Sequence, residues 1–137
     1  MVVTMSLDNP VFQSFIVYSA ILALKLLALG PLTGITRMRK NVFYDDPDVE
    51  RVRRAHLNDI ENIPAFWILG ALYVTTGPAV AWATLLFRIF TGGRILHTIV
   101  YAVKPLPQPA RGIAYFIPYL ILWYMGVNVV LYYASAL

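Results

Sequence analysis

The sequence predicts an all-α integral membrane protein: one domain, residues 1–137, of four transmembrane helices packed as an up-down bundle. Hydrophobic residues make up 59% of the 137 residues and charged residues 13%, against about 45–50% and about 25% in an ordinary soluble domain. A chain this short has too small an interior to hide so much apolar surface from water. The apolar residues also gather in four segments, each near the roughly 20 residues that a spanning helix needs. A soluble monomer and a disordered chain are therefore excluded.

The first helix is predicted over residues 10–36. Asn9 can cap its start, and Pro10 suits the first helical position, where no backbone N–H donor is needed. The apolar stretch that follows carries one charge, Lys25. We expect a retained span rather than a cleaved signal peptide, because no basic region precedes it and no small-residue cleavage site follows it.

The second helix is predicted over residues 47–76, after the Asp-Pro start signal at residues 46–47. Its first half is polar and its second half is apolar, and Pro64 inside it favours a kink. Gly-Pro at residues 77–78 ends it.

The third helix is predicted over residues 79–103 and the fourth over residues 109–134, with Pro118 inside the fourth. The proline-rich segment 104–109 separates the two helices, because proline removes a backbone donor and breaks a continuing helix.

Basic residues decide the orientation of the predicted bundle. They flank the first and last connections, which lie at the same end of an up-down bundle: Arg37, Arg39, Lys40, Arg51, Arg53, Arg54, Lys104 and Arg111. The positive-inside rule places that end in the cytosol. The net charge of +4 is explained by this orientation, so no nucleic acid partner is expected.

The composition also excludes several kinds of site. The chain has no cysteine, which rules out disulfides, a thiol nucleophile and thiolate metal ligands. Two histidines, His56 and His97, are too few for a histidine-rich metal cluster, and we expect no metal.

Polar residues recur along one face of the second helix. Their spacing of i, i+4, i+8 and i+11 places four of them on the same side: Glu50, Arg54, Asn58 and Glu61. A solvated ion pair explains Glu50. Asn58 and Glu61 adjoin the apolar half, where a lipid-facing carboxylate is costly. We expect these two to face a polar cavity or a partner helix, and a purely structural contact between helices stays as an alternative.

The third helix carries charged and polar residues within its predicted span. Three of them share a face at i, i+3 and i+7: Arg94, His97 and Tyr101. Basic residues inside a membrane either pair or bind something. For Arg88 and Arg94 the structural alternative is a pair with Asp59 or Glu61. For His97 the structural alternative is a histidine that only packs, and for Tyr101 it is a tyrosine at the membrane interface.

Two further basic residues lie near the same end of the bundle. Arg111 falls in the first turn of the fourth helix, with Tyr115 one turn later, and an arginine beside free backbone N–H groups suits an anion or a lipid headgroup. Lys25 can extend its side chain to the interface or bind a carboxylate. These residues predict a polar pocket for an anionic ligand, bordered by lipid. These residues alone support three functions about equally: an enzyme, a lipid-binding protein and a small transporter.

Several segments resemble one known family. Residues 48–62, DVERVRRAHLNDIEN, closely resemble the second-helix signature of the membrane-associated eicosanoid and glutathione metabolism family. Residues 93–98 and 106–109 resemble its third helix and the following loop, and residues 33–40 resemble the end of its first helix. The matching segments spread over about residues 25–115, most of the chain.

The resemblance implies a glutathione transferase that joins the glutathione thiolate to lipophilic electrophiles and reduces lipid hydroperoxides. It also implies a homotrimer among membrane lipids, with glutathione between neighbouring subunits. The location implied is the endoplasmic reticulum membrane, with the outer mitochondrial membrane as a second one and the active site on the cytosolic side. Arg111 matches the arginine that holds the glutathione sulfur as a thiolate. The positions matching the family's glutathione contacts are Arg37, Arg54, Asn58, Glu61, His97, Tyr101, Arg111 and Tyr115.

Two departures favour the transferases of this family over its prostaglandin E synthases. Leu57 stands where those synthases have an arginine, and Gly112 stands where they have a serine beside the thiolate arginine. A glutathione-dependent isomerase of the prostaglandin E synthase type stays as the alternative. A non-enzymatic lipid-binding member is ranked lower, because Arg111 is present.

Overall fold

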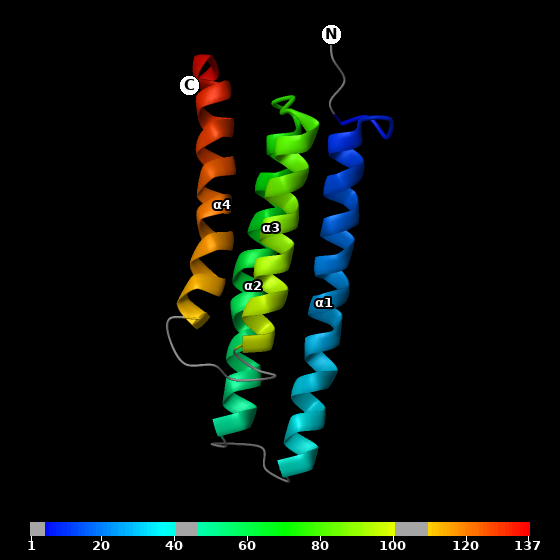
Figure 1. The fold of residues 1–137 in the computed structure, drawn as a ribbon, viewed down its shortest axis with the longest axis vertical. Helices are drawn as coiled ribbons and strands as arrows, with labels where there is room; N and C mark the ends of the chain where they lie inside the picture. The colour runs from blue at the N-terminus through cyan, green and yellow to red at the C-terminus, as the bar shows by residue number, and fades with distance from the viewer. Residues whose placement is uncertain (1–4, 41–46, 101–109) are drawn as a thin grey trace.

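Four long helices run side by side along one axis and alternate in direction (Figure 1). A computed structural model describes residues 5–40, 47–100 and 110–137. The helices are α1 (Pro10–Lys40), α2 (Pro47–Val74), α3 (Val80–Thr98) and α4 (Ala110–Tyr132), followed by the short 3₁₀ turn η2 (Ala134–Ala136). Both termini lie at one end, and the end of α1 and the start of α2 lie at the other. The predicted all-α up-down bundle is confirmed.

The helix bounds differ from the expected ranges by a few residues. α1 begins at Pro10 and continues to Lys40, past the expected end at 36, because arginine, methionine and lysine are good helix formers. α2 ends at Val74, and α4 ends at Tyr132. The expected end of the third helix at 103 and the expected start of the fourth helix at 109 lie outside the described residues.

Local sequence signals account for the start of α1 and the end of α2. Asn9 Oδ1 accepts a hydrogen bond from the Val11 N–H at 3.0 Å, which confirms the predicted N-cap. After α2, the Gly77 N–H donates to the Val74 carbonyl at 3.1 Å. Gly77 has φ 68, a left-handed conformation that glycine adopts without the penalty of a Cβ atom.

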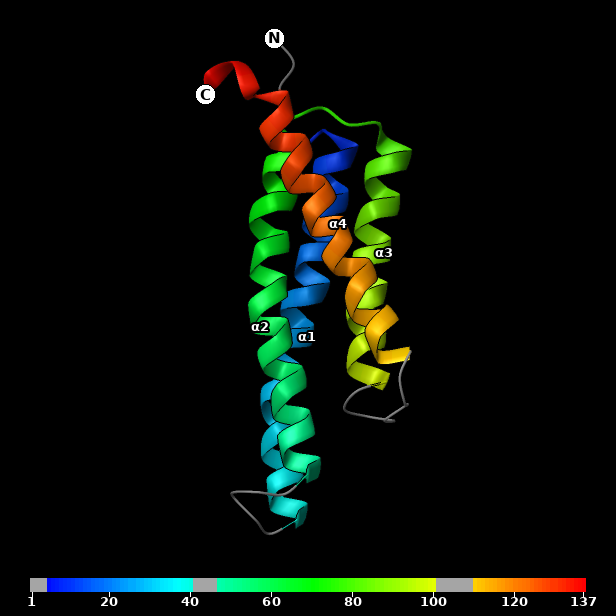
Figure 2. The same cartoon turned by 90° about the vertical axis from the view of Figure 1, so that its left-hand side faces the viewer.

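α1 and α4 lie on opposite sides of the α2–α3 pair (Figure 2). α1 packs against α2 and α3, and α4 packs against the same two helices. α1 and α2 have 31 and 28 residues, whereas α3 and α4 have 19 and 23. The two longer helices therefore project beyond α3 and α4 at the end where α1 finishes and α2 begins. We call this end, which carries Arg39, Arg51, Arg53 and Arg54, the basic end.

The half of the bundle nearer the termini has an aromatic core. Phe66 of α2 stacks on Phe90 of α3 with ring centroids 4.5 Å apart. Phe15 of α1 lies 5.6 Å from Phe66 and 5.9 Å from Phe87. Phe66, Phe87 and Phe90 are fully buried. Aromatic pairs at these separations add to the energy gained from close packing.

Two glycines allow close approach between helices. A Cβ atom on Gly93 of α3 would lie 2.5 Å from the Pro118 ring of α4, and one on Gly70 of α2 would lie 2.6 Å from the Phe15 ring. Pro118 is fully buried, so α4 continues through its proline while the ring fills the space beside Gly93.

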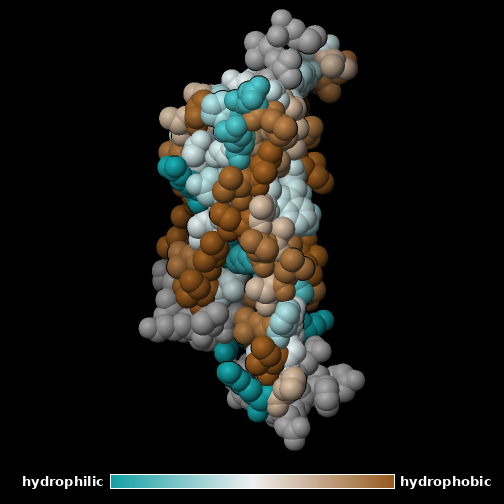
Figure 3. Space-filling view, turned by 90° about the vertical axis from the view of Figure 1, so that its right-hand side faces the viewer, coloured by the Kyte–Doolittle hydropathy of each residue, from teal (hydrophilic) through white to brown (hydrophobic). Residues whose placement is uncertain are grey.

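The face of the bundle seen in Figure 3 is largely hydrophobic, with scattered hydrophilic side chains. Among the described residues, segments 10–36 and 112–132 are long and apolar enough, by length and composition alone, to cross a membrane. α2 and α3 carry charges within their length. The position of those charges identifies the candidate site.

Candidate functional site

A buried carboxylate joins three helices in the half of the bundle nearer the basic end. Asp59 of α2 is fully buried. Its Oδ1 accepts hydrogen bonds from Arg94 Nη2 at 2.5 Å and from Arg94 Nε at 3.1 Å. Its Oδ2 pairs with Lys25 Nζ of α1. Arg94 of α3 is also fully buried, so α1, α2 and α3 meet at one carboxylate. We call Lys25, Asp59 and Arg94 the ion cluster.

The ion cluster confirms the structural alternative for Arg94 and the carboxylate alternative for Lys25. A buried charge without a partner has a large unfavourable free energy, and inside a membrane no water is present to solvate it. From the sequence, Asp59 was expected only as a possible partner of Arg88 or Arg94. In the structure its carboxylate binds both Arg94 and Lys25. Arg88 differs, since its Nε donates to the Tyr18 hydroxyl at 2.9 Å rather than to a carboxylate.

Asn58, next to Asp59, is bound to the same arginine. Its Oδ1 accepts a hydrogen bond from Arg94 Nη2. Its backbone carbonyl accepts one from Asn62 Nδ2 at 2.8 Å. Asn58 is half-buried. Its side-chain amide therefore connects the buried ion cluster with the accessible surface of the protein.

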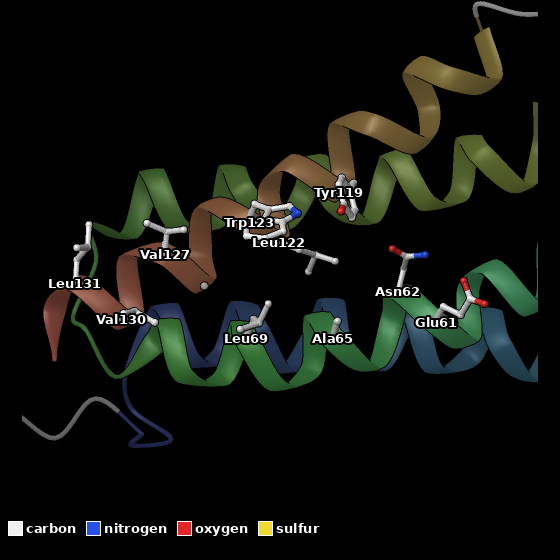
Figure 4. A pocket seen from close by; sticks show the side chains of 11 residues that line it. Glu61, Asn62, Ala65, Leu69, Tyr119, Leu122, Trp123, Val127, Val130 and Leu131 are labelled. Atoms are coloured by element: carbon white, nitrogen blue, oxygen red, sulfur yellow. The ribbon is translucent and has the colours of Figure 1, made fainter. Parts of the chain in front are cut away.

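A cleft of about 600 Å³ lies between α2 and α4 (Figure 4). Glu61 and Asn62 lie at one end, and Val127 and Leu131 lie toward the other. The rest of the lining is aromatic or aliphatic: Ala65, Leu69, Tyr119, Leu122, Trp123, Gly126 and Val130. A ligand in this cleft would meet polar groups at one end and an apolar wall along its length.

Glu61 supplies the carboxylate of the cleft. Its side chain is exposed, and no hydrogen bond or ion pair links it to another residue in the described part of the chain. Two positions earlier on α2, the Asp59 carboxylate already pairs with the buried cations Lys25 and Arg94. The Glu61 carboxylate is therefore an exposed acceptor at the polar end of the cleft.

Aromatic rings connect the end of α3 with the cleft. The His97 and Tyr115 ring centroids lie 6.2 Å apart, and those of Tyr115 and Tyr119 lie 5.6 Å apart with nearly parallel planes. Tyr119 lines the cleft, as does Trp123 one turn further on. Sequence analysis missed Tyr119 and Trp123, although their i, i+4, i+8 spacing with Tyr115 was a readable signal.

The part of α2 at the basic end carries an exposed charge cluster. Arg54 Nε and Arg53 Nη1 donate to the Glu50 carboxylate at 3.0 and 3.2 Å. The hydrogen bond from Arg54 and the charges of both arginines hold the pKa of Glu50 below its usual 4.5. This pair confirms the solvated-face interpretation of Glu50 and places the Arg54 side chain one turn of α2 from Asn58.

The structure thus brings some of the predicted site residues together and leaves others undescribed. Arg54, Asn58 and Glu61 follow one another along α2, and His97 meets Tyr115 between α3 and α4. Arg37 lies in the last turns of α1 and Arg111 is the second residue of α4, but their side chains are outside the described atoms. Tyr101 lies outside the described residues. Within residues 5–40, 47–100 and 110–137, no group of three His, Cys, Asp or Glu could hold a metal ion.

Comparison with known proteins gives a consistent set of relatives. The model of the MAPEG family matches residues 15–131. Microsomal glutathione S-transferase 1 of Rattus norvegicus is 42% identical over 132 residues, which cover 82% of this chain and 84% of that protein. The protein of the same name from Homo sapiens is 39% identical over 135 residues, covering 85% and 86%. Prostaglandin E synthase of Homo sapiens is 35% identical over 124 residues, covering 80% and 81%.

Proposed function

Because this chain belongs to the MAPEG family, a family of four-helix membrane bundles, we propose that it is a glutathione transferase acting at the membrane. The thiolate of glutathione forms a bond to a lipophilic electrophile that arrives from the bilayer, and the bond between the electrophile and its leaving group breaks. The same thiolate reduces a lipid hydroperoxide to an alcohol and water, while two glutathione molecules are oxidised to the disulfide. The named relatives include transferases and prostaglandin E synthases. Leu57 and Gly112 favour the first activity over the second.

The observation that carries this proposal is the cleft between α2 and α4. Its polar end, with Glu61 and Asn62, adjoins a long apolar wall. A transferase of this kind must hold a water-soluble tripeptide beside a substrate that dissolves in lipid. A cleft that is polar at one end and apolar along its length meets both requirements.

The exposed polar groups around that end fit glutathione. The tripeptide has an ammonium group, two carboxylates, two amides and a thiol. The Glu61 carboxylate suits the ammonium group, and Arg54 suits a carboxylate, which an arginine can bind with two parallel hydrogen bonds. Asn58 suits an amide, and the hydroxyl of Tyr115 can donate to the sulfur or to the backbone. Further contacts are proposed for Arg37, His97 and Tyr101.

Arg111 is proposed as the catalytic residue. A free thiol has a pKa of about 8.5, so little of it is ionised at neutral pH. A guanidinium stays charged, and the first turn of a helix adds a positive field from its free N–H groups. As the second residue of α4, Arg111 combines both effects. Lowering the thiol pKa by about two units would make most of the bound glutathione reactive near pH 7.

The setting of the enzyme follows from the charge pattern and the family. We propose a homotrimer in the endoplasmic reticulum membrane, with the outer mitochondrial membrane as a second location. Glutathione enters from the cytosolic side, where α1 and α2 project beyond the other helices. Arg54 and Glu61 have exposed side chains in a single protomer, as expected for a site that a neighbouring subunit completes.

The decisive experiment measures conjugation of glutathione to chlorodinitrobenzene by the purified protein, with the uncatalysed rate subtracted. Arg111→Ala should lower kcat about 25-fold at pH 7, because the ionised fraction of the thiol falls from about three quarters to about 3% when its pKa rises by about two units to 8.5. The dissociation constant of glutathione should change little. Arg111→Lys, which keeps the charge, should retain part of the activity. Equal losses of rate and affinity would mean that Arg111 only binds glutathione.

The wild-type protein gives the other outcomes. Glutathione binding without turnover would favour the isomerase, to be tested with a prostaglandin endoperoxide. A folded protein that binds no glutathione would favour a lipid-binding protein.

A matched pair of arginines tests the binding site separately. Arg53 and Arg54 are neighbours, both are exposed, and both donate to Glu50. Arg54→Ala should weaken glutathione binding several-fold, since one charge-assisted contact is lost. Arg53→Ala should not, because successive residues on a helix point in different directions. Equal effects of the two substitutions would remove Arg54 from the site.

A further inference from the structure

Asn58 and Asp59 are neighbours on α2 that share one partner on α3. Arg94 Nη2 donates to the side-chain oxygens of both residues, at 2.5 Å to Asp59, and Arg94 Nε donates a further bond to Asp59 at 3.1 Å. A guanidinium has hydrogen-bond donors and no acceptor. The atom of the Asn58 amide that faces Arg94 is therefore its oxygen.

This contact determines which atom of Asn58 can meet a ligand. The amide is planar, with its oxygen and nitrogen on opposite sides of the same carbon, so an oxygen held by Arg94 turns the nitrogen away from Arg94. In the described part of the structure Asn58 Nδ2 has no acceptor, and the residue is only half-buried. Asn58 thus presents two N–H donors on the side away from Arg94, while its side-chain oxygen is engaged by Arg94.

Arg94 is in turn held by the rest of the ion cluster. The side-chain exposures of Arg94 and Asp59 are 1% and 0%, and Asp59 also pairs with Lys25. Rotating the guanidinium away from Asn58 would disturb its bonds to a fully buried carboxylate, which is costly. Two cations also surround a single carboxylate, so the ion cluster keeps one net positive charge beside the Asn58 amide.

We propose that Arg94 is a positioning residue for glutathione. It fixes the Asn58 amide as a hydrogen-bond donor toward an oxygen of the tripeptide, and the Lys25–Asp59 pair keeps Arg94 in place. This inference rests on the proposed function. It assigns a role in binding to a buried arginine that does not itself touch the ligand, and it makes Asn58 a donor rather than an acceptor.

A double-mutant cycle tests the proposal. Arg94→Lys keeps a cation beside Asp59 but loses the planar fork that reaches both side chains. It should raise the KM for glutathione about tenfold, the effect of about one hydrogen bond, with a smaller change in kcat. Asn58→Ala should raise KM at least as much. In the Asn58→Ala background, Arg94→Lys should raise KM no further, because coupled residues give non-additive effects.

Asn58→Asp and Arg88→Lys complete the design. An aspartate at position 58 can still accept from Arg94 but cannot donate, so the thermal stability should be kept while KM rises. Arg88→Lys changes another arginine of α3, one that contacts Tyr18, and should leave KM unchanged.

The outcomes separate this proposal from the proposed function. If Arg94→Lys multiplies KM equally in both backgrounds, or if Asn58→Asp binds glutathione as well as the wild-type protein, the positioning role is wrong while the transferase stands. If the wild-type protein is folded and binds no glutathione, both proposals are wrong.

Discussion

The two halves of this bundle hold the same three helices together by different means. Toward the termini, Phe15, Phe66 and Phe90 join α1, α2 and α3 through stacked and tilted rings. Toward the basic end, the ion cluster joins the same three helices through one buried carboxylate. Apolar packing depends on volume and tolerates substitution, whereas a buried ion pair requires particular atoms in particular places. The second arrangement therefore costs more to disturb, and through Arg94 it also holds the Asn58 side chain.

The largest effect is expected from Asp59→Asn. This change leaves Lys25 and Arg94 buried without a counter-charge, and breaking a buried pair costs about 3–5 kcal/mol. Thermal unfolding of the protein purified in detergent measures the loss. A replacement of the whole ion cluster by apolar residues, Lys25→Met with Asp59→Leu and Arg94→Met, should recover much of the stability without restoring glutathione binding. Recovery of both would show that the ion cluster only holds the helices.

A smaller effect is expected where α3 approaches α4. Gly93→Ala would bring a Cβ atom to 2.5 Å from the Pro118 ring, and overpacking of this kind costs about 1–3 kcal/mol. Gly92 is the matched control, because nothing lies within 4 Å of a Cβ atom there. Gly92→Ala should leave the unfolding temperature unchanged or raise it slightly, since alanine favours a helix. Equal losses from both variants would mean that helix propensity, and not close approach, explains the glycines.

The aromatic half should tolerate a conservative change. Phe66→Leu keeps most of the volume and all of the apolar character, so we expect a loss of about 1 kcal/mol or slightly more. The KM for glutathione should not change, because Phe66 contacts Phe15, Phe87 and Phe90 rather than the polar end of the cleft. A clear rise in KM at retained stability would contradict the division of the bundle into two halves.

The smallest effect is expected at Glu50, which pairs with arginines on the exposed part of α2. The pKa of Glu50 is lowered in the folded protein, so its contribution to stability is present above pH 4.5 and is lost as the pH falls through that lowered pKa. Glu50→Gln should therefore unfold slightly earlier than the wild-type protein at pH 7, and the difference should vanish in strong acid. It also removes a carboxylate from α2, which makes it a control for Asp59→Asn. A large loss at neutral pH would show that exposed pairs matter here as much as buried ones.

The helices were predictable because their signals are local. The cap at Asn9, the glycine that ends α2 and the apolar stretches each depend on a few neighbouring residues. The distribution of arginine and lysine predicts which end of the bundle is cytosolic, and this stays a prediction. The end of α1 at Lys40 was less predictable, since no strong breaker stands where the expected helix ended.

The site was predictable only in part. Periodicity put Asn58 and Glu61 on one face of α2, but it could not tell that one meets Arg94 and the other lines a cleft. Arg94 and Asp59 had been considered as a structural pair, and Lys25 as able to bind a carboxylate. That all three meet at Asp59 required the structure. Tyr119 and Trp123 entered the site only through the cleft that they line.

The sequence by itself determined the class of the protein, its four helices and the family to which it belongs. Composition, periodicity and local start and stop signals act over short stretches of chain, so they can be read without knowing how the helices meet. The tertiary structure alone decided which cation shares Asp59, which atom of Asn58 faces outward, and which side of α2 forms the cleft. Those outcomes depend on how three helices rotate and shift against one another, and a buried charge must satisfy the partners that this packing happens to bring within reach.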